Sequence, residues 1–145
     1  DWERAKAYTK EYLDVMPADK YGFRAQDSVR TFAQQMLHLA QANFFLGSNG
    51  TGKERPNFGR NLEQAASAQS KDSVTYYVNL SYDWMIDAIK NMDWTKLEEK
   101  QGRGNFSGTR LGWILKTFEH QTHHRGQTTI YIRLVGVKPP NEKLF

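Results

Sequence analysis

All four histidines of this chain lie in two short segments, and three of them have a placement that suits metal binding. His120 and His124 are four residues apart, so on a helix their imidazoles stand one turn above each other on the same face. Two neutral imidazoles at this spacing can chelate one divalent transition metal. His123 is offset from His124 by about 100° around a helix, so we do not expect it to be a direct ligand.

The third histidine, His38, lies far from this pair in the sequence. It lies on another predicted helix, away from the main apolar stripe and beside Thr31, Ala42 and Phe45, at an edge where a neighbouring helix could approach. Three histidines with one open position would form a catalytic type of metal site rather than a closed structural one. The spacing alone also leaves open that these histidines are hydrogen-bonded residues of the core.

Apolar residues recur at three- and four-residue steps in four stretches, which predicts four helices that would position the histidines. The expected helices cover about residues 2–15, 28–46, 73–92 and 109–135. Asp27 or Ser28 is the expected cap of the second helix, and Asp72 or Ser73 that of the third. With no strand-like alternation, these elements predict an all-α, antiparallel four-helix bundle that forms a single domain over residues 1–145.

Two connections are rich in glycine and polar residues. Residues 47–71, between the second and third helices, form a connection long enough to be functional or mobile, with a short helix expected at residues 62–68. Residues 101–108, before the last helix, are expected to form a loop.

The last helix has two faces without charge. One face gathers apolar side chains: Leu111, Ile114, Leu115, Phe118 and Ile132. The nearly opposite face carries the histidine pair: Trp113, Thr117, His120, His124, Tyr131 and Val135. A helix of this kind is covered on both sides, so it lies centrally or also faces a second subunit in a homodimer. Trp113 and Tyr131 share the histidine face and are therefore candidates to line a substrate pocket.

Composition limits the classes of partner. The net charge is +4, but lysines and arginines are interspersed with acids, which argues against a nucleic-acid partner. No apolar run approaches the ~20 residues needed to cross a bilayer, so no membrane partner is expected. The absence of cysteine excludes disulfides and thiolate ligands, and leaves both a cytoplasmic and an exported location open. Because the chain starts at Asp1 without Met, we expect that an upstream segment was removed.

Several segments resemble the DinB family, the DNA-damage-inducible, YfiT-like metal-binding four-helix bundle proteins. The resemblance is carried by residues 119–127 (EHQTHHRGQ), by residues 131–134 and 136–140, and by residues 30–40 around His38. It implies that the metal ligands are His38, His120 and His124, with water completing the sphere, and that the metal is nickel or zinc. It also makes His123, Arg125 and Gln127 candidates to support the ligands or to pack between helices, while Gly126 would allow another helix to approach closely.

The resemblance further implies an activity, because some family members are thiol S-transferases. We expect a metal-dependent enzyme that joins a low-molecular-weight thiol to a small electrophile in stress or detoxification. A metal-dependent hydrolase is an alternative that needs a general base. Gln121 stands where the zincin motif has its glutamate, so that base would come from elsewhere, such as Asp83 or Asp87. A non-enzymatic, metal-binding stress-response protein is the other alternative, and it predicts an occluded cleft.

Overall fold

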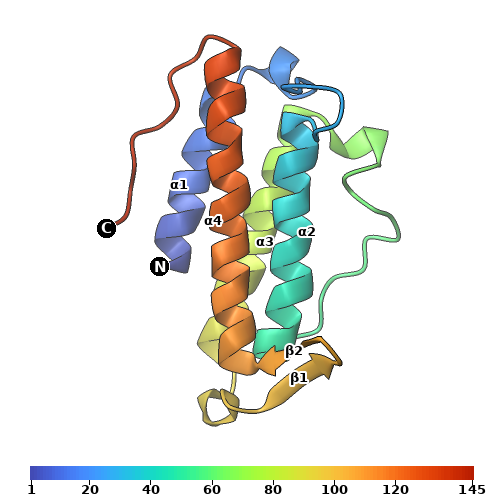
Figure 1. Cartoon of the computed structure of the whole chain (residues 1–145), viewed down its shortest axis with the longest axis vertical. Helices are drawn as coiled ribbons and strands as arrows, with labels where there is room; N and C mark the ends of the chain where they lie inside the picture. Colours follow the sequence, from blue (N-terminus) through green and yellow to red (C-terminus); the bar gives the residue numbers. More distant parts are fainter.

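The computed structural model describes residues 1–145 and contains four long helices that lie side by side along its long dimension (Figure 1). These helices are α1 (Trp2–Val15), α2 (Phe32–Thr51), α3 (Lys71–Asn91) and α4 (Arg110–Leu134). Short 3-10 turns lie in the connections: η1 (Ala18–Lys20), η2 (Ala66–Ala68) and η3 (Trp94–Lys96). The expected helical class is therefore right for most of the chain.

A small hairpin at the foot of the helices corrects the prediction of a loop at residues 101–108. Strands β1 (Lys100–Arg103) and β2 (Phe106–Thr109) pair antiparallel, in a register that sets Lys100 against Thr109 and Arg103 against Phe106. Gly102 has φ 96°, and a Cβ there would lie 2.1 Å from the carbonyl oxygen of Phe106. Only glycine fits this position, so the glycines that suggested a loop instead make close strand pairing possible.

Helix α2 begins and ends later than its sequence pattern suggests. Its cap is Thr31, not Asp27 or Ser28: the Thr31 hydroxyl accepts from the backbone N–H of Gln34, whose side chain accepts from the Thr31 N–H. This reciprocal pair satisfies two N–H groups that the first turn leaves free. At the other end the helix continues through residues 47–51 and stops at Gly52, with φ 77°.

One glycine inside α2, Gly50, serves the packing of this helix against α4. A Cβ on Gly50 would lie 2.7 Å from Cγ1 and 3.1 Å from the backbone nitrogen of Ile114. Glycine at this point therefore lets the two helix backbones approach closely. Gly126 has no such role within this chain, because a Cβ there would have no other atom within 4 Å.

The other boundaries differ only slightly from expectation. Ser70, rather than Asp72 or Ser73, caps α3 by accepting from the Ser73 N–H. Thr109 caps α4 by accepting from the Gly112 N–H, and Gly136 follows the helix with φ 81°. The short helix expected at residues 62–68 is reduced to the turn η2.

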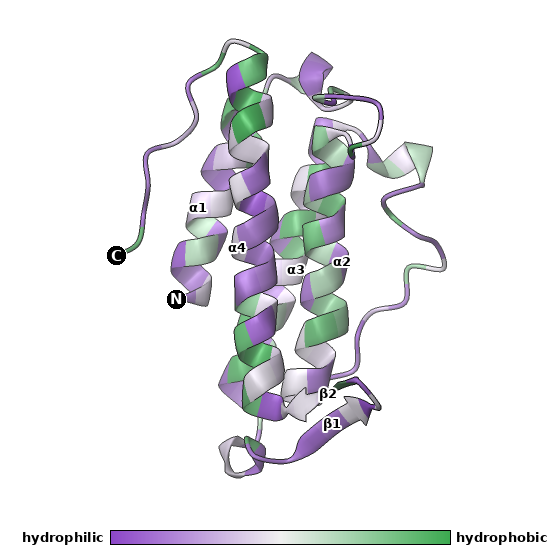
Figure 2. Cartoon of the chain, viewed as in Figure 1, coloured by the Kyte–Doolittle hydropathy of each residue, from purple (hydrophilic) through white to green (hydrophobic).

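The middle of α4 is coloured hydrophilic in Figure 2, and several buried positions of this helix are polar. Leu111 and Leu115, which were expected on a covered face, are 38% and 60% exposed. The buried positions of α4 are instead Trp113, Thr117, Gln121, His124, Arg125, Thr128, Tyr131 and Ile132. The polar ones are tolerated because they find partners: Tyr82 of α3 donates to Oε1 of Gln121 at 2.7 Å, and the Arg125 guanidinium donates to the same oxygen at 3.0 Å.

No helix of the structure combines the length and the apolar character that a membrane crossing would need.

Candidate metal centre

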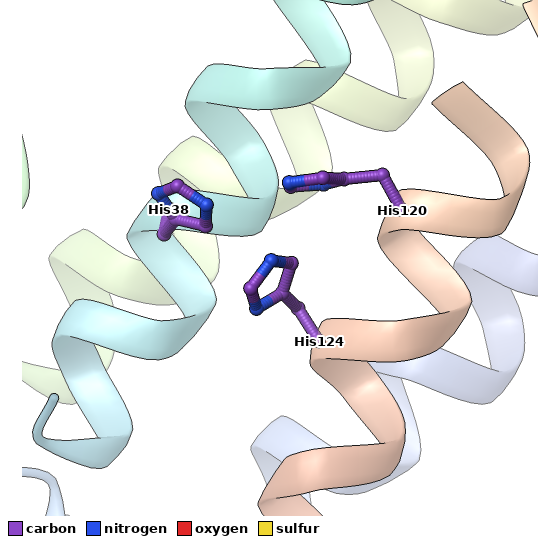
Figure 3. A group of neighbouring side chains, drawn as sticks. All are labelled: His38, His120 and His124. Carbon is purple, nitrogen blue, oxygen red and sulfur yellow. The ribbon is translucent and has the colours of Figure 1, made fainter. Parts of the chain in front are cut away.

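Three histidine side chains from two helices converge on one point between α2 and α4. His38 projects from α2, and His120 and His124 project from successive turns of α4 (Figure 3). One nitrogen of each ring lies within 4.8 Å of the corresponding nitrogens of the other two. Nitrogens that share one zinc at about 2.0–2.1 Å lie roughly 3.3 Å apart, so the rings would need to draw only slightly closer to hold one ion.

The ring of His38 is oriented by a carboxylate from the long connection. Oε1 of Glu63 lies 2.7 Å from Nδ1 of His38, and Oε2 of Glu63 accepts from Nε of Arg30 at 2.7 Å. Because a carboxylate only accepts, Nδ1 of His38 carries the proton and Nε2 keeps its lone pair for a ligand. Burial acts to raise the pKa of Glu63, but the hydrogen bonds from His38 and Arg30 outweigh it and hold that pKa below its ordinary value.

Two glutamines orient His124 in a similar way. Oε1 of Gln127 lies 3.0 Å from Nδ1 of His124, and Gln35 of α2 donates to the same oxygen. Nε2 of Gln35 is also 2.9 Å from the His124 ring nitrogen. Nδ1 of His124 thus contacts one amide donor and one amide oxygen. The tautomer that donates Nδ1–H to Gln127 leaves the Nε2 lone pair of His124 available to a metal.

His120 has a free ring nitrogen. Its Nδ1 is buried and has no hydrogen-bond partner in the protein. A buried nitrogen of this kind costs free energy unless something else satisfies it, which fits a site that is completed by an ion or a ligand.

The environment keeps His120 and His124 neutral. Burial, together with the nearby His38 and His123, lowers the pKa of His120 to about 4. Burial, and then His120 and the other nearby histidines, lowers the pKa of His124 to about 3. Near neutral pH both imidazoles are therefore in the unprotonated form that binds metals.

Two cavities open beside His120. The larger, about 900 Å³, lies under the long connection and also touches His38 and Glu63. The smaller, about 450 Å³, lies toward the hairpin and is walled in part by Trp113 and His123. Leu46 and Phe106 line both cavities, and the Phe106 ring lies between Phe45 (centroids 6.2 Å apart) and Trp113 (4.9 Å). A small molecule therefore has room on either side of the histidines.

The structure separates the remaining candidate residues into two groups. Gln127, Trp113 and His123 lie at the histidines or at the adjacent cavity. Tyr131 donates to the carbonyl of Arg30 at 2.8 Å, so it secures the backbone beside the Arg30–Glu63 pair.

Arg125 faces away from the histidines, toward α1. Its guanidinium donates to Thr9 and lies 4.5 Å from the centre of the Tyr8 ring. This places Arg125 in helix packing, one of the two roles expected for it.

The carboxylates suggested as general bases are also elsewhere. Asp83 pairs with Lys6 and Asp87 with Lys53, and neither aspartate lines a cavity that touches the histidines. The carboxylates that do line these cavities are Glu54, Glu63 and Glu119.

Sequence reasoning missed Glu63, Arg30 and Gln35. Gln35 lies three residues before His38, so it is on the neighbouring turn of α2, and this spacing was its only signal. Glu63 lies within the long connection, and nothing in its sequence neighbourhood marks it. The length of that connection was the available hint, because long loops in compact domains are commonly functional.

Comparisons with known proteins identify the family and the fold. The family model described as "DinB family" matches residues 1–144. A DinB-like protein from Bacillus cereus has a similar structure, with a TM-score of 0.80, 17% identity, and coverage of 98% of this chain and 93% of that one. A DinB-like protein from Bacillus subtilis, YjoA, is also similar, with a TM-score of 0.74, 11% identity, and coverage of 97% of this chain and 93% of that one. At these identities the two structures establish the fold alone. No match was found among curated proteins.

Proposed function

The chain belongs to the DinB family, and on that premise we propose that it is a metal-dependent enzyme that joins a low-molecular-weight thiol to a small electrophile. In this proposal an antiparallel bundle of the four helices holds one divalent metal on His38, His120 and His124. The observation that carries the proposal is the convergence of these three histidines, two of them held neutral by burial, at a point that two cavities reach.

Nickel or zinc is the metal that we propose. Three imidazole nitrogens without a carboxylate or thiolate ligand suit zinc, nickel, copper or iron among the common metals, and the family resemblance favours the first two. A divalent cation on neutral ligands keeps its full charge, so it would bind a thiol as the thiolate and lower the thiol pKa toward neutrality.

The protein's own residues would orient the reactants. Glu63 and Gln127 fix the rings of His38 and His124, and the two cavities allow the thiol and the electrophile to approach from different sides. The thiolate sulfur supplies an electron pair to the electrophilic carbon, and a leaving group on that carbon departs with the pair of the broken bond. The thiol proton passes to solvent.

The same features favour transfer over the alternatives. Hydrolysis would need a base next to the histidines, but Glu63 is engaged by His38 and Arg30, and both Asp83 and Asp87 form ion pairs elsewhere. Glu54 and Glu119 line the cavities, but neither is hydrogen-bonded to a histidine. A purely metal-storing stress protein would gain from an occluded site, whereas this site is flanked by open cavities. We place the activity in stress response or detoxification, where small electrophiles are removed.

Metal analysis and a thiol assay test this proposal together. Tag-free protein should contain about one equivalent of nickel or zinc by mass spectrometry, and His38→Ala, His120→Ala and His124→Ala should each lose it while circular dichroism shows the helices intact. Arg133→Ala is the control, because Arg133 is exposed on the same helix and lines neither cavity. Loaded protein should accelerate the thiol-dependent loss of 1-chloro-2,4-dinitrobenzene, and His120→Ala should abolish this. Failure to bind any first-row metal after reconstitution would overturn the proposal.

A further inference from the structure

We propose that the larger cavity recognises an anionic group through Arg55 and Arg60, so that the thiol bound beside His38 and His120 carries a carboxylate or a comparable oxyanion. That the ligand is a thiol rests on the function proposed above; the assignment of the anion site rests on the two arginines.

Both arginines line the cavity that reaches the histidines. Residues 54–58, together with Arg60 and Glu63, form the wall that the long connection contributes, while His38, Gln41 and Phe45 contribute from α2. Gln41 accepts from the backbone N–H of Glu63 at 3.2 Å, so the connection is fastened to α2 beside the histidine cluster. The arginine-bearing wall and the candidate metal ligands therefore belong to one site.

Neither guanidinium is neutralised by a carboxylate. Arg60 donates to the hydroxyls of Ser67 (3.2 Å) and Tyr77 (3.3 Å), which are uncharged. The Arg55 guanidinium lies over the Phe45 ring, 5.1 Å from its centre. Neither arginine forms a salt bridge, although ten other lysines and arginines of the chain do. The donor fork of Arg55 is therefore open to an anion of matching shape, and Arg60 keeps N–H groups beyond the two that it gives to Ser67 and Tyr77.

The acids in the cavity wall do not cancel this charge. Glu63 is occupied by His38 and Arg30. Glu54 is the other acid in the wall, and it forms an ion pair with neither Arg55 nor Arg60. Two unpaired cations therefore face one unpaired anion, and the surplus favours a negatively charged ligand.

The smaller cavity has a different character. Lys116 and Glu119 balance each other in its wall, and Leu46, Phe106 and Trp113 supply its apolar surface. An uncharged, apolar molecule fits this side better. The two sides of the histidine cluster thus differ in charge, which would assign the anionic thiol to the larger cavity and the electrophile to the smaller one.

Binding measurements by isothermal calorimetry at low ionic strength test this assignment. The probes are mercaptosuccinate, which has two carboxylates, and 1-thioglycerol, a neutral thiol of similar size. Zinc-loaded protein should bind mercaptosuccinate at least about tenfold more tightly than 1-thioglycerol. The Arg55→Gln/Arg60→Gln variant should lose this preference and keep its affinity for 1-thioglycerol. Arg24→Gln, an exposed arginine outside the cavity, should keep the preference.

The variants separate this inference from the proposed function. A preference for mercaptosuccinate that persists in Arg55→Gln/Arg60→Gln would overturn the inference, because the charge of the metal alone would then explain it. Equal binding of the two thiols by the unaltered protein would also overturn it, while leaving thiol binding by the loaded protein intact. Succinate, which has two carboxylates and no thiol, tests the anion site without the metal. Metal-free protein should bind succinate, and the Arg55→Gln/Arg60→Gln variant should not. This result does not depend on whether the histidines take up zinc.

Discussion

Oε1 of Glu63 lies 2.7 Å from Nδ1 of His38, which ties the long connection between α2 and α3 to the candidate metal centre. The contact does two things at once. It fixes the ring so that Nε2 faces the other histidines, and it holds the wall that carries Arg55 and Arg60 over the larger cavity. Metal binding and the order of the connection are thereby linked through one carboxylate.

Replacing Glu63 with Gln should weaken metal binding without unfolding the protein. The amide keeps the shape of the side chain but loses the negative charge that stabilises His38 as a ligand, and loss of such a partner typically lowers metal affinity by about 10- to 100-fold. Zinc affinity measured by competition with a chromophoric chelator checks this. Glu119→Gln is the control, because Glu119 lines the smaller cavity and forms no hydrogen bond to a histidine. An equal loss in both variants would remove Glu63 from the positioning role.

Metal-free protein should become less stable as the pH falls from about 6.5 to 5. Folding lowers the pKa of His120 to about 4 and that of His124 to about 3, whereas in the unfolded chain both stay near 6.5. Within this window the unfolded chain takes up protons on these two residues and the folded chain does not, so the free energy of unfolding decreases as the solution becomes more acidic. Once the pH is below the pKa values that His120 and His124 have in the folded protein, these two residues cause no further decrease in the free energy of unfolding.

Urea denaturation at several pH values measures this effect. His120→Asn/His124→Asn should show a flatter dependence between pH 6.5 and 5, a range in which most carboxylates remain ionised and contribute little. Identical slopes for this variant and the unaltered protein would show that neither histidine is buried in its neutral form.

The sequence predicted the helices well because their apolar residues recur at helical spacing, as in α1 and α3. Of the two faces of α4 that were expected to be covered, the histidine face is buried, but Leu111 and Leu115 on the other are exposed. A pattern based on hydrophobicity favours these leucines over Gln121 and Thr128, which are buried instead. Gln121 is buried because Tyr82 and Arg125 satisfy its oxygen, and such a partnership across helices cannot be read from one segment.

In the candidate metal centre, too, the sequence predicted the local features but not the contacts between distant segments. The four-residue spacing of His120 and His124 is local, so the sequence revealed it. His38 was assigned through resemblance to a family. Glu63 reaches His38 only because of the path of the long connection, which no local pattern specifies.

Two glycines in helices should respond oppositely to substitution by alanine. Gly126→Ala should stabilise the fold by about 1 kcal/mol, because a Cβ there meets nothing and alanine is the better helix former. Gly50→Ala should instead destabilise it by about 1–3 kcal/mol, since the new Cβ would press on the backbone of Ile114 and separate α2 from α4. Urea denaturation of both variants gives the comparison. Gly50→Ala should also reduce zinc affinity, because a wider separation of α2 and α4 would move His38 away from His120. An unchanged zinc affinity would show that the distance between these helices at Gly50 does not affect the metal centre.

We propose that the exposed apolar row on α4 is covered by a second copy of the chain. Leu111 and Leu115 are 38% and 60% exposed on the side of the helix opposite the histidines, and burial of this row in a homodimer would remove apolar surface from water. Light scattering after size-exclusion chromatography should give about twice the chain mass of 16.8 kDa. Leu111→Lys/Leu115→Glu should give the monomer with unchanged helicity and zinc content, because neither leucine touches the metal centre.

Leu134→Glu is the control, since Leu134 is 56% exposed at another angle around the same helix. A monomeric mass for the unaltered protein at micromolar concentration would contradict the dimer and leave the row as ordinary surface.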